Sequence, residues 1–144
     1  MLRNRPPFPI AALMTLVLAA CLFAHGRVWD FLGYTQVDSR LDHGKIEIRR
    51  HDYLFRAIQL RITGDAIFFD HVLVHFANGT YQEVVISRRV SSEQQEYVID
   101  LPGEGHILEN VEFFYFKEPW QQNPTLSLYG LRLPDPNVGI ESER

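Results

Sequence analysis

An alternation of apolar and polar residues at every second position limits most strongly what this chain can fold into. Residues 55–62 show it clearly, because Ile58, Leu60 and Ile62 alternate with other side chains. The intervening residues are Ala57, Gln59 and Arg61. Successive side chains of a strand point to opposite faces, so the segment is predicted to be a strand with one face in the core and the other in water. The same period recurs along the chain, which favours strands over helices.

Turn sequences separate the segments that show this period. Asn78-Gly79 gives the strongest hairpin signal, since both residues tolerate the positive φ of a type I′ turn, and another turn is predicted at residues 42–44. The expected strands cover residues 31–37, 45–49, 55–62, 66–76, 80–87, 97–101, 107–117 and 126–133. Short strands at such intervals predict an all-β protein, an antiparallel β-sandwich of jelly-roll-like topology with about eight strands.

The length of 144 residues leaves room for one domain. We expect a single β-sandwich domain over residues 27–133 and a disordered polar tail over residues 134–144. A net charge of −4 argues against a broad basic surface, so nucleic acid is not an expected partner. The one cysteine cannot close an internal disulfide.

The first 26 residues have the order of an export signal. Arg3 and Arg5 precede a run over residues 10–24 that is uncharged and, apart from Thr15, apolar. A positive segment followed by a short apolar run is typical of a secretory signal, whereas a core helix carries polar residues along one side. We therefore expect export to the periplasm or beyond the cell.

Three fates of this segment are open. The small residues Ala24 and Gly26 favour cleavage after Gly26, which would release a free chain. Leu18-Ala19-Ala20-Cys21 resembles the lipobox of bacterial lipoproteins, which implies cleavage before Cys21 and acylation of its sulfur. Retention is the third, since residues 7–24 would give about 27 Å of helix against a hydrocarbon core of about 30 Å. Membrane attachment would run through Cys21 or through the uncleaved segment.

Histidines are the first candidates for a metal site. His71 and His75 are predicted on one face of a strand, but their Cα atoms would lie roughly 13.6 Å apart, too far for one zinc ion. They are expected to flank Leu73 on the outer face. His43, His51 and His106 lie next to predicted turns, and the acidic segment 38–44 lacks the ligand spacing of a calcium loop. We expect no metal and no cofactor.

No set of residues selects a catalytic site. None of the serines lies in a Gly-x-Ser-x-Gly elbow, and the paired carboxylates fall in or near polar turns, where solvated charge is the rule. These pairs are Asp38 with Asp42, Glu93 with Glu96, and Glu109 with Glu112. We therefore predict that the protein is not an enzyme, and a small hydrolase is the least favoured alternative.

Consecutive aromatic residues at positions 113–116 are the other candidates for binding, because exposed rings bind sugars and peptides. On a strand, two of these rings must point away from the core, and a loop bearing Trp120 is expected to cover them. The doublets Arg49-Arg50 and Arg88-Arg89 are each expected to supply one solvated arginine and one residue at a sheet edge. The sequence selects no ligand-binding residue.

A set of positions spread over residues 31–131 carries a resemblance to a known family. They are Leu32-Gly33, Asp42, Ile46, Phe55, Ile58, Leu60, Val72, Val74, Phe76, Asn78-Gly79, residues 98–101, Ile107, Val111, Tyr115 and Leu128-Tyr129-Gly130. In this order they resemble small exported bacterial proteins classed as a domain of unknown function. The second half is also similar, more weakly, to galactose-binding-like jelly rolls such as discoidin and carbohydrate-binding domains, and that similarity carries over no ligand residue.

These observations predict an exported β-sandwich protein with a non-enzymatic binding or envelope-associated accessory role. The alternative is a carbohydrate-binding module. The sequence leaves the partner unknown, and a glycan or another envelope component is the candidate. A binding module should show exposed aromatic rings beside polar groups, whereas an enzyme should show a cleft with convergent titratable residues.

Overall fold

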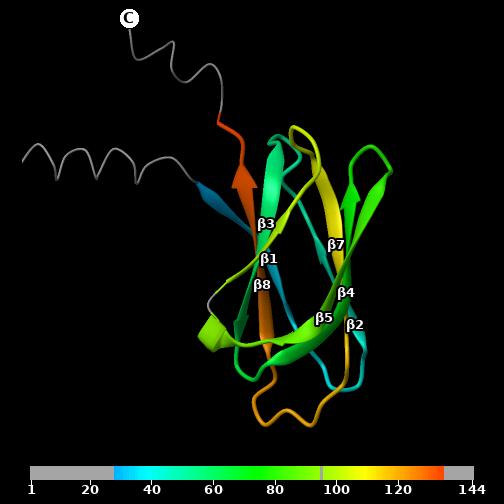
Figure 1. The fold of residues 1–144 in the computed structure, drawn as a ribbon, viewed down its shortest axis with the longest axis vertical. Helices are drawn as coiled ribbons and strands as arrows, with labels where there is room; N and C mark the ends of the chain where they lie inside the picture. The colour runs from blue at the N-terminus through cyan, green and yellow to red at the C-terminus, as the bar shows by residue number, and fades with distance from the viewer. Residues whose placement is uncertain (1–27, 95, 135–144) are drawn as a thin grey trace, which may run out of the picture.

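Two four-stranded antiparallel sheets pack face to face in the computed structural model, which describes residues 28–94 and 96–134 (Figure 1). The sheet that we call the β1 sheet contains β1 (Trp29–Gln36), β8 (Thr125–Arg132), β3 (Phe55–Thr63) and β6 (Tyr97–Asp100). The β2 sheet contains β2 (His43–Glu47), β7 (Leu108–Tyr115), β4 (Ile67–Phe76) and β5 (Tyr81–Val90). A short 3-10 helix, η1 (Ser92–Gln94), lies between β5 and β6. The predicted all-β sandwich is confirmed.

The strand order is that of a jelly roll. It runs β1-β8-β3-β6 in one sheet and β2-β7-β4-β5 in the other. Among the eight strands, β4 and β5 alone follow each other in the chain and pair within a sheet, so every other connection crosses between the sheets. Two Greek keys wound in this way form a double-sheet jelly roll, and the predicted topology is therefore confirmed as well.

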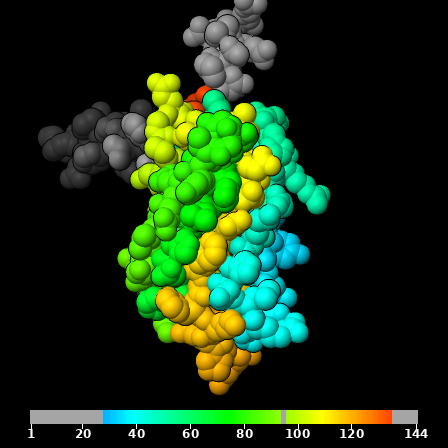
Figure 2. Space-filling view, turned by 90° about the vertical axis from the view of Figure 1, so that its right-hand side faces the viewer, coloured from blue at the N-terminus to red at the C-terminus, as the bar shows by residue number. Residues whose placement is uncertain are grey.

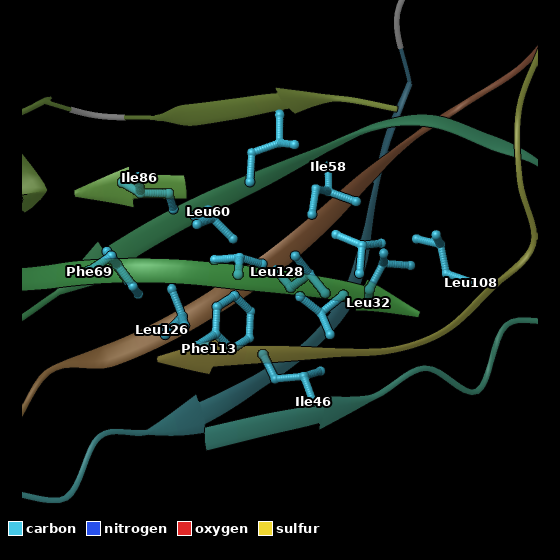
Figure 3. Close-up of a cluster of buried hydrophobic side chains, with 14 of the residues drawn as sticks. Leu32, Ile46, Ile58, Leu60, Phe69, Ile86, Leu108, Phe113, Leu126 and Leu128 are labelled. Atoms are coloured by element: carbon cyan, nitrogen blue, oxygen red, sulfur yellow. The ribbon is translucent and has the colours of Figure 1, made fainter. Parts of the chain in front are cut away.

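The core lies between the two sheets (Figure 3). The β1 sheet contributes Ile58 and Leu60 and the β2 sheet contributes Phe69 and Phe113, all without exposed surface. Strand β3 thus buries the side chains that its alternation selects. Each such side chain contributes roughly 1.5–3 kcal/mol through burial, so this layer supplies the main drive for folding.

The opposite face of β3 differs from the expectation. The alternation predicts Ala57 and Gln59 in water, but they are 2% and 1% exposed. Because β3 is an interior strand, register places Gln59 between Tyr129 of β8 and Val98 of β6. The Nε of Arg61 donates a 2.8 Å hydrogen bond to the Gln59 Oε1, which satisfies the buried amide oxygen. The prediction of a solvated face is therefore wrong for these two residues.

The β4–β5 hairpin is confirmed, but its predicted turn type is wrong. A type I′ turn needs positive φ at both Asn78 and Gly79. Gly79 has a φ of +88°, whereas Ser87 is the one non-glycine residue with positive φ in the described chain. The Gly79 N–H donates to the Phe76 carbonyl oxygen at 3.1 Å, and the Phe76 N–H donates to the Thr80 carbonyl oxygen at 2.9 Å. This is the arrangement of a turn followed by a glycine bulge.

The turn predicted at residues 42–44 is misplaced. The chain reverses over residues 38–41, where the Leu41 N–H donates to the Asp38 carbonyl oxygen at 3.1 Å. The Asp38 carboxylate also accepts hydrogen bonds from the backbone and the guanidinium of Arg40. Strand β2 begins at His43, so this histidine lies in the sheet and not in a turn.

The export signal predicted over residues 1–26, Cys21 included, lies outside the described residues, as does segment 135–144 of the predicted tail. Cleavage, lipidation and retention therefore stay predictions. Within the described ranges, no helix has the length and apolar character needed to span a membrane.

Candidate functional site

Three rings stand side by side on the outer face of the β2 sheet. Register places Phe114 of β7 opposite His43 of β2 on one side and His71 of β4 on the other. The His71 and Phe114 rings stack with centroids 4.3 Å apart and planes 9° apart, and the His43 and Phe114 centroids are 5.9 Å apart. Figure 2 looks onto this face, where golden-yellow β7 runs diagonally between green β4 and β5 and cyan β2. The sheet thus assembles a stack from residues distant in sequence.

A β-bulge in β4 places an acid beside the second histidine. Against β7 the register shifts between Phe69 and His71, whose partners Tyr115 and Phe114 are consecutive, so Asp70 is the extra residue in this pairing. Phe69 and Val72 are both fully buried, which leaves Asp70 and His71 pointing outward together. The Asp70 Oδ2 lies 2.7 Å from the His71 Nδ1. The geometry of the backbone therefore creates this histidine–carboxylate pair.

A second pair of the same kind lies at the start of β2. The Asp42 Oδ1 is 3.0 Å from the His43 Nδ1. The hydrogen bond from His43 holds the pKa of the Asp42 carboxyl below its usual range, and the charge of Lys117 adds to the effect. The Tyr115 hydroxyl donates to the His43 carbonyl oxygen at 3.4 Å, and burial raises the pKa of this phenol. Each pair therefore commits one imidazole nitrogen to a carboxylate.

An open hollow of about 620 Å³ lies beside these pairs. We call it the β7 hollow, and its lining residues are Asp42, Asp70, His71, Phe114, Tyr115, Phe116 and Lys117. None of them is a serine, threonine or cysteine that a histidine could activate as a nucleophile. The lining offers rings and polar groups suited to binding.

The predicted arrangement of His71 and His75 is confirmed. Both lie on the outer face of β4 with Leu73 between them, and no register shift falls within this stretch. The His75 Nε2 lies 3.8 Å from the Glu112 Oε2. Within residues 28–94 and 96–134, no three His, Cys, Asp or Glu side chains gather as metal ligands would.

The consecutive rings of β7 divide between its two faces, as the alternation predicts. Tyr115 is buried, whereas Phe114 points outward and Phe116, next to it in the hollow, is 52% exposed. The expectation that the Trp120 loop covers the outward rings is wrong. Trp120 packs against Tyr115 with centroids 6.1 Å apart, and its Nε1 donates to the Ala66 carbonyl oxygen at 2.9 Å. This hydrogen bond holds the indole against the residue that precedes β4, and the Phe116 ring is left 52% exposed.

The arginines of the second doublet take separate partners. Arg88 and Arg89 both lie on the edge strand β5. Arg89 forms a two-point ion pair with Glu118, and the Arg88 guanidinium lies 4.7 Å from the centre of the Tyr97 ring. The doublet therefore makes no joint anion site.

The outer face of the β1 sheet carries a second candidate surface, which we call the aromatic face. It consists of Phe31, Tyr34, Arg61 and Tyr129. Phe31 and Tyr34 of the edge strand β1 are 51% and 68% exposed. The Phe31 and Tyr129 rings meet edge to face with centroids 5.5 Å apart, and the Arg61 guanidinium lies 4.1 Å from the Tyr129 ring centre. Exposed rings beside a polar group are what the binding-module prediction requires.

The aromatic face depends on an irregularity in β1 that sequence reasoning missed. A register shift between Phe31 and Gly33 brings Phe31 and Tyr34 to the same side, where strict alternation would separate them. Gly33 has a φ of +154°, and a Cβ there would lie 2.8 Å from the Ile46 Cγ2. A glycine inside an aromatic strand is the signal that could have found this bulge.

The family of the chain is shown by comparison. Residues 11–130 match the family described as Domain of unknown function (DUF2541). The chain belongs to this family. The resemblance seen in the sequence is thereby confirmed. Some of the residues that carry this resemblance pack against each other in the structure. A Cβ added to Gly130 would lie 2.6 Å from Phe55 and 2.9 Å from Leu32, so close packing explains these three positions of this DUF2541 chain.

Comparison with characterised proteins adds the fold alone. No curated protein matches this DUF2541 chain. Among solved structures, AlgX from Pseudomonas aeruginosa is similar, with a TM-score of 0.52 and 10% sequence identity. The match covers 76% of this chain and 28% of AlgX, so the chain spans little more than a quarter of that protein. A likeness at this identity supports a β-rich fold and transfers no activity.

Proposed function

We propose that this DUF2541 protein is an exported, non-enzymatic binding protein with an accessory role in the cell envelope. The aromatic face is the observation that carries the proposal. Exposed rings gathered beside a guanidinium are typical of interaction surfaces. The rings of Phe31, Tyr34 and Tyr129 are not part of the buried core cluster.

A non-enzymatic role is consistent with the chemistry of the β7 hollow. Both carboxylates of its lining are paired with a neighbouring histidine, Asp42 with His43 and Asp70 with His71. Nucleophilic catalysis needs a base within reach of a nucleophile, and the lining contains no serine, threonine or cysteine. Binding needs no such arrangement.

Export is supported by the sequence. Arg3 and Arg5 precede the apolar run over residues 10–24 in the order of a secretory signal. We propose a periplasmic or secreted location, with attachment to a membrane through Cys21 or through an uncleaved N-terminal segment as variants of it.

A carbohydrate-binding module is the second candidate. The β7 hollow favours it, because rings and polar groups line the same concavity. Small-ligand sites combine an apolar lining with a few polar groups that orient the ligand.

Fractionation of a Gram-negative host that expresses the full-length chain tests export. Intact mass should show loss of the first 20 residues if the lipobox is used, or of 26 residues if cleavage follows Gly26. In the lipidated case, Cys21→Ser should abolish palmitate labelling. A chain that still begins at Met1 and is recovered in the cytosolic fraction contradicts export.

Co-sedimentation of the recovered protein with peptidoglycan sacculi and with envelope membrane vesicles tests binding. The double variant Phe31→Ser and Tyr34→Ser should bind about tenfold more weakly, because exposed rings dominate such contacts. The matched control Tyr81→Ser removes a 63% exposed ring from the β2 sheet and should bind as the wild type does. Equal binding by all of these proteins, or no binding by the wild type, contradicts the proposal.

A further inference from the structure

We propose that the β7 hollow binds a neutral saccharide unit, a hydroxyl-rich ring without net charge. The inference rests on the carbohydrate-binding version of the proposed function and gives it a site. That site lies on the β2 sheet, whereas the aromatic face lies on the β1 sheet. The two surfaces can therefore be tested separately.

The hollow has the size and the apolar contacts of a small-ligand site. Its volume of about 620 Å³ lies within the range of about 300–1,000 Å³ that is typical of such sites. Phe116 is 52% exposed, and its ring meets Phe68 edge to face with centroids 5.3 Å apart. A held, accessible ring of this kind can pack against the C–H face of a sugar.

The two histidine–carboxylate pairs supply the hydrogen bonds. An ionised carboxylate only accepts, so the Nδ1 of His71 donates its proton to Asp70 and the Nδ1 of His43 donates to Asp42. Of the two histidines, His71 lines the hollow, and in its neutral imidazole the Nε2 is then an acceptor. Asp70 and Asp42 are 51% and 70% exposed, so their remaining lone pairs are accessible. Hydroxyl groups donate to such acceptors, and they also accept from Lys117 at the same hollow.

The charges in the hollow favour a neutral ligand over a charged one. Asp42 and Asp70 repel an anion, and Lys117 repels a cation, while its charge, which also lowers the Asp42 pKa, offsets part of the attraction that the two carboxylates exert on that cation. Like charges brought together on binding cost affinity in either case. A sugar without net charge avoids both penalties and keeps hydrogen bonds to all three groups.

The position of Phe114 between the pairs excludes one alternative and sets the span of the site. Strand β7 lies between β2 and β4, so His43 and His71 stand on opposite sides of the Phe114 ring. They cannot both place a nitrogen about 2.0–2.1 Å from one zinc ion. A ligand that reaches both pairs must instead cross the ring, as a saccharide with hydroxyls at both ends can.

NMR titration of the recovered protein with the methyl glycosides of glucose, galactose, mannose and N-acetylglucosamine tests the proposal. At least one should cause saturable shifts confined to the hollow, and galacturonate and glucosamine should bind more weakly. Asp70→Ala should lower the affinity for that glycoside about tenfold or more, since it removes a charged acceptor. The control Asp100→Ala removes an exposed carboxylate from β6 in the other sheet and should bind as the wild type does.

A second variant guards against a folding effect. Phe116→Ala should lower the affinity for the glycoside. Because the ring is half exposed, the urea midpoint of this variant should stay close to that of the wild type. No saturable shifts with any neutral glycoside, a preference for the charged sugars, or unchanged affinity in Asp70→Ala would overturn the saccharide site.

The aromatic-face variant separates this inference from the proposed function. The double variant Phe31→Ser and Tyr34→Ser should lose envelope binding and keep normal affinity for the glycoside. Normal envelope binding by a protein without glycoside affinity would refute the saccharide site and leave the binding role standing. Loss of glycoside affinity in the double variant would refute the placement of the sugar in the β7 hollow.

Discussion

Replacement of Gly130 by alanine should destabilise the sandwich by an amount that the packing sets. A Cβ at this position would lie 2.6 Å from the Phe55 Cδ1 and 2.9 Å from the Leu32 Cδ1, and both neighbours are buried. Overpacking of this kind costs about 1–3 kcal/mol, whereas alanine returns about 0.4–1 kcal/mol by restricting the unfolded chain. The free energy of unfolding should therefore fall by about 1–2 kcal/mol, out of a total of about 5–15 kcal/mol.

Gly44→Ala is the matched control for this substitution. Gly44 lies in β2, and the nearest atom to an added Cβ is the Thr35 Cγ2 at 3.7 Å, an ordinary contact. Neither Gly44 nor Gly130 has positive φ, so the backbone accepts alanine at both. Gly44→Ala should be neutral or stabilising by up to about 1 kcal/mol. The two variants should then differ by about 2 kcal/mol, or by roughly 1 M in urea midpoint for a slope of about 2 kcal/mol per M.

A substitution of Phe55 tests the cause of the loss. In the Gly130→Ala background, Phe55→Leu removes the ring edge that the new methyl group meets. Circular dichroism during urea unfolding should show that the double variant loses less free energy than the two single variants together, by about 0.5 kcal/mol or more. Equal midpoints for Gly130→Ala and Gly44→Ala, or strict additivity with Phe55→Leu, would refute the packing explanation.

Three further predictions concern buried and titrating side chains. In urea melts, Leu60→Ala should cost about 2–5 kcal/mol and Gln59→Ala about 1–3 kcal/mol, because the amide is buried and hydrogen-bonded; a neutral Gln59→Ala would contradict this. By NMR, the pKa of the Asp42 carboxyl should lie below its ordinary value and should rise in His43→Ala. The stability that this carboxylate contributes is therefore present above the unfolded pKa and is lost as pH falls through the folded pKa. By ultraviolet titration, the pKa of the Tyr115 phenol should lie above its ordinary value. The stability that this phenol contributes is therefore present below the unfolded pKa and is lost as pH rises through the folded pKa. Tyr115→Phe should abolish this loss of stability at alkaline pH.

The fold class can be predicted from the sequence because alternation reports which face of a strand meets the core. Ile58 and Leu60 are buried as their period requires. The same pattern carries no information about the strands on either side. Gln59 is covered because β3 is interior and Tyr129 and Val98 flank it, and only the strand order reveals this.

The candidate site could not be predicted, because register decides it. Phe114 meets His43 and His71 only in the observed pairing of β7 with β2 and β4. A slip of one residue would turn these rings to the other face. His43 was further hidden by the turn chemistry of residues 42–44, which the pairing with β7 overrides by extending β2 to His43.

The bulge at Asp70 shows how a conflict in the sequence produces the site. The buried apolar residues of β4 occupy odd positions up to Phe69 and even positions from Val72 onward. Unbroken alternation that buries Val72 would turn Asp70 into the core, where an unpaired carboxylate costs several kcal/mol. One extra residue in the strand changes the parity, buries both apolar sets and leaves Asp70 in water beside His71. The pair that lines the β7 hollow is thus a consequence of keeping a carboxylate out of the core, and the odd-to-even change around Asp70 is the sequence feature that records it.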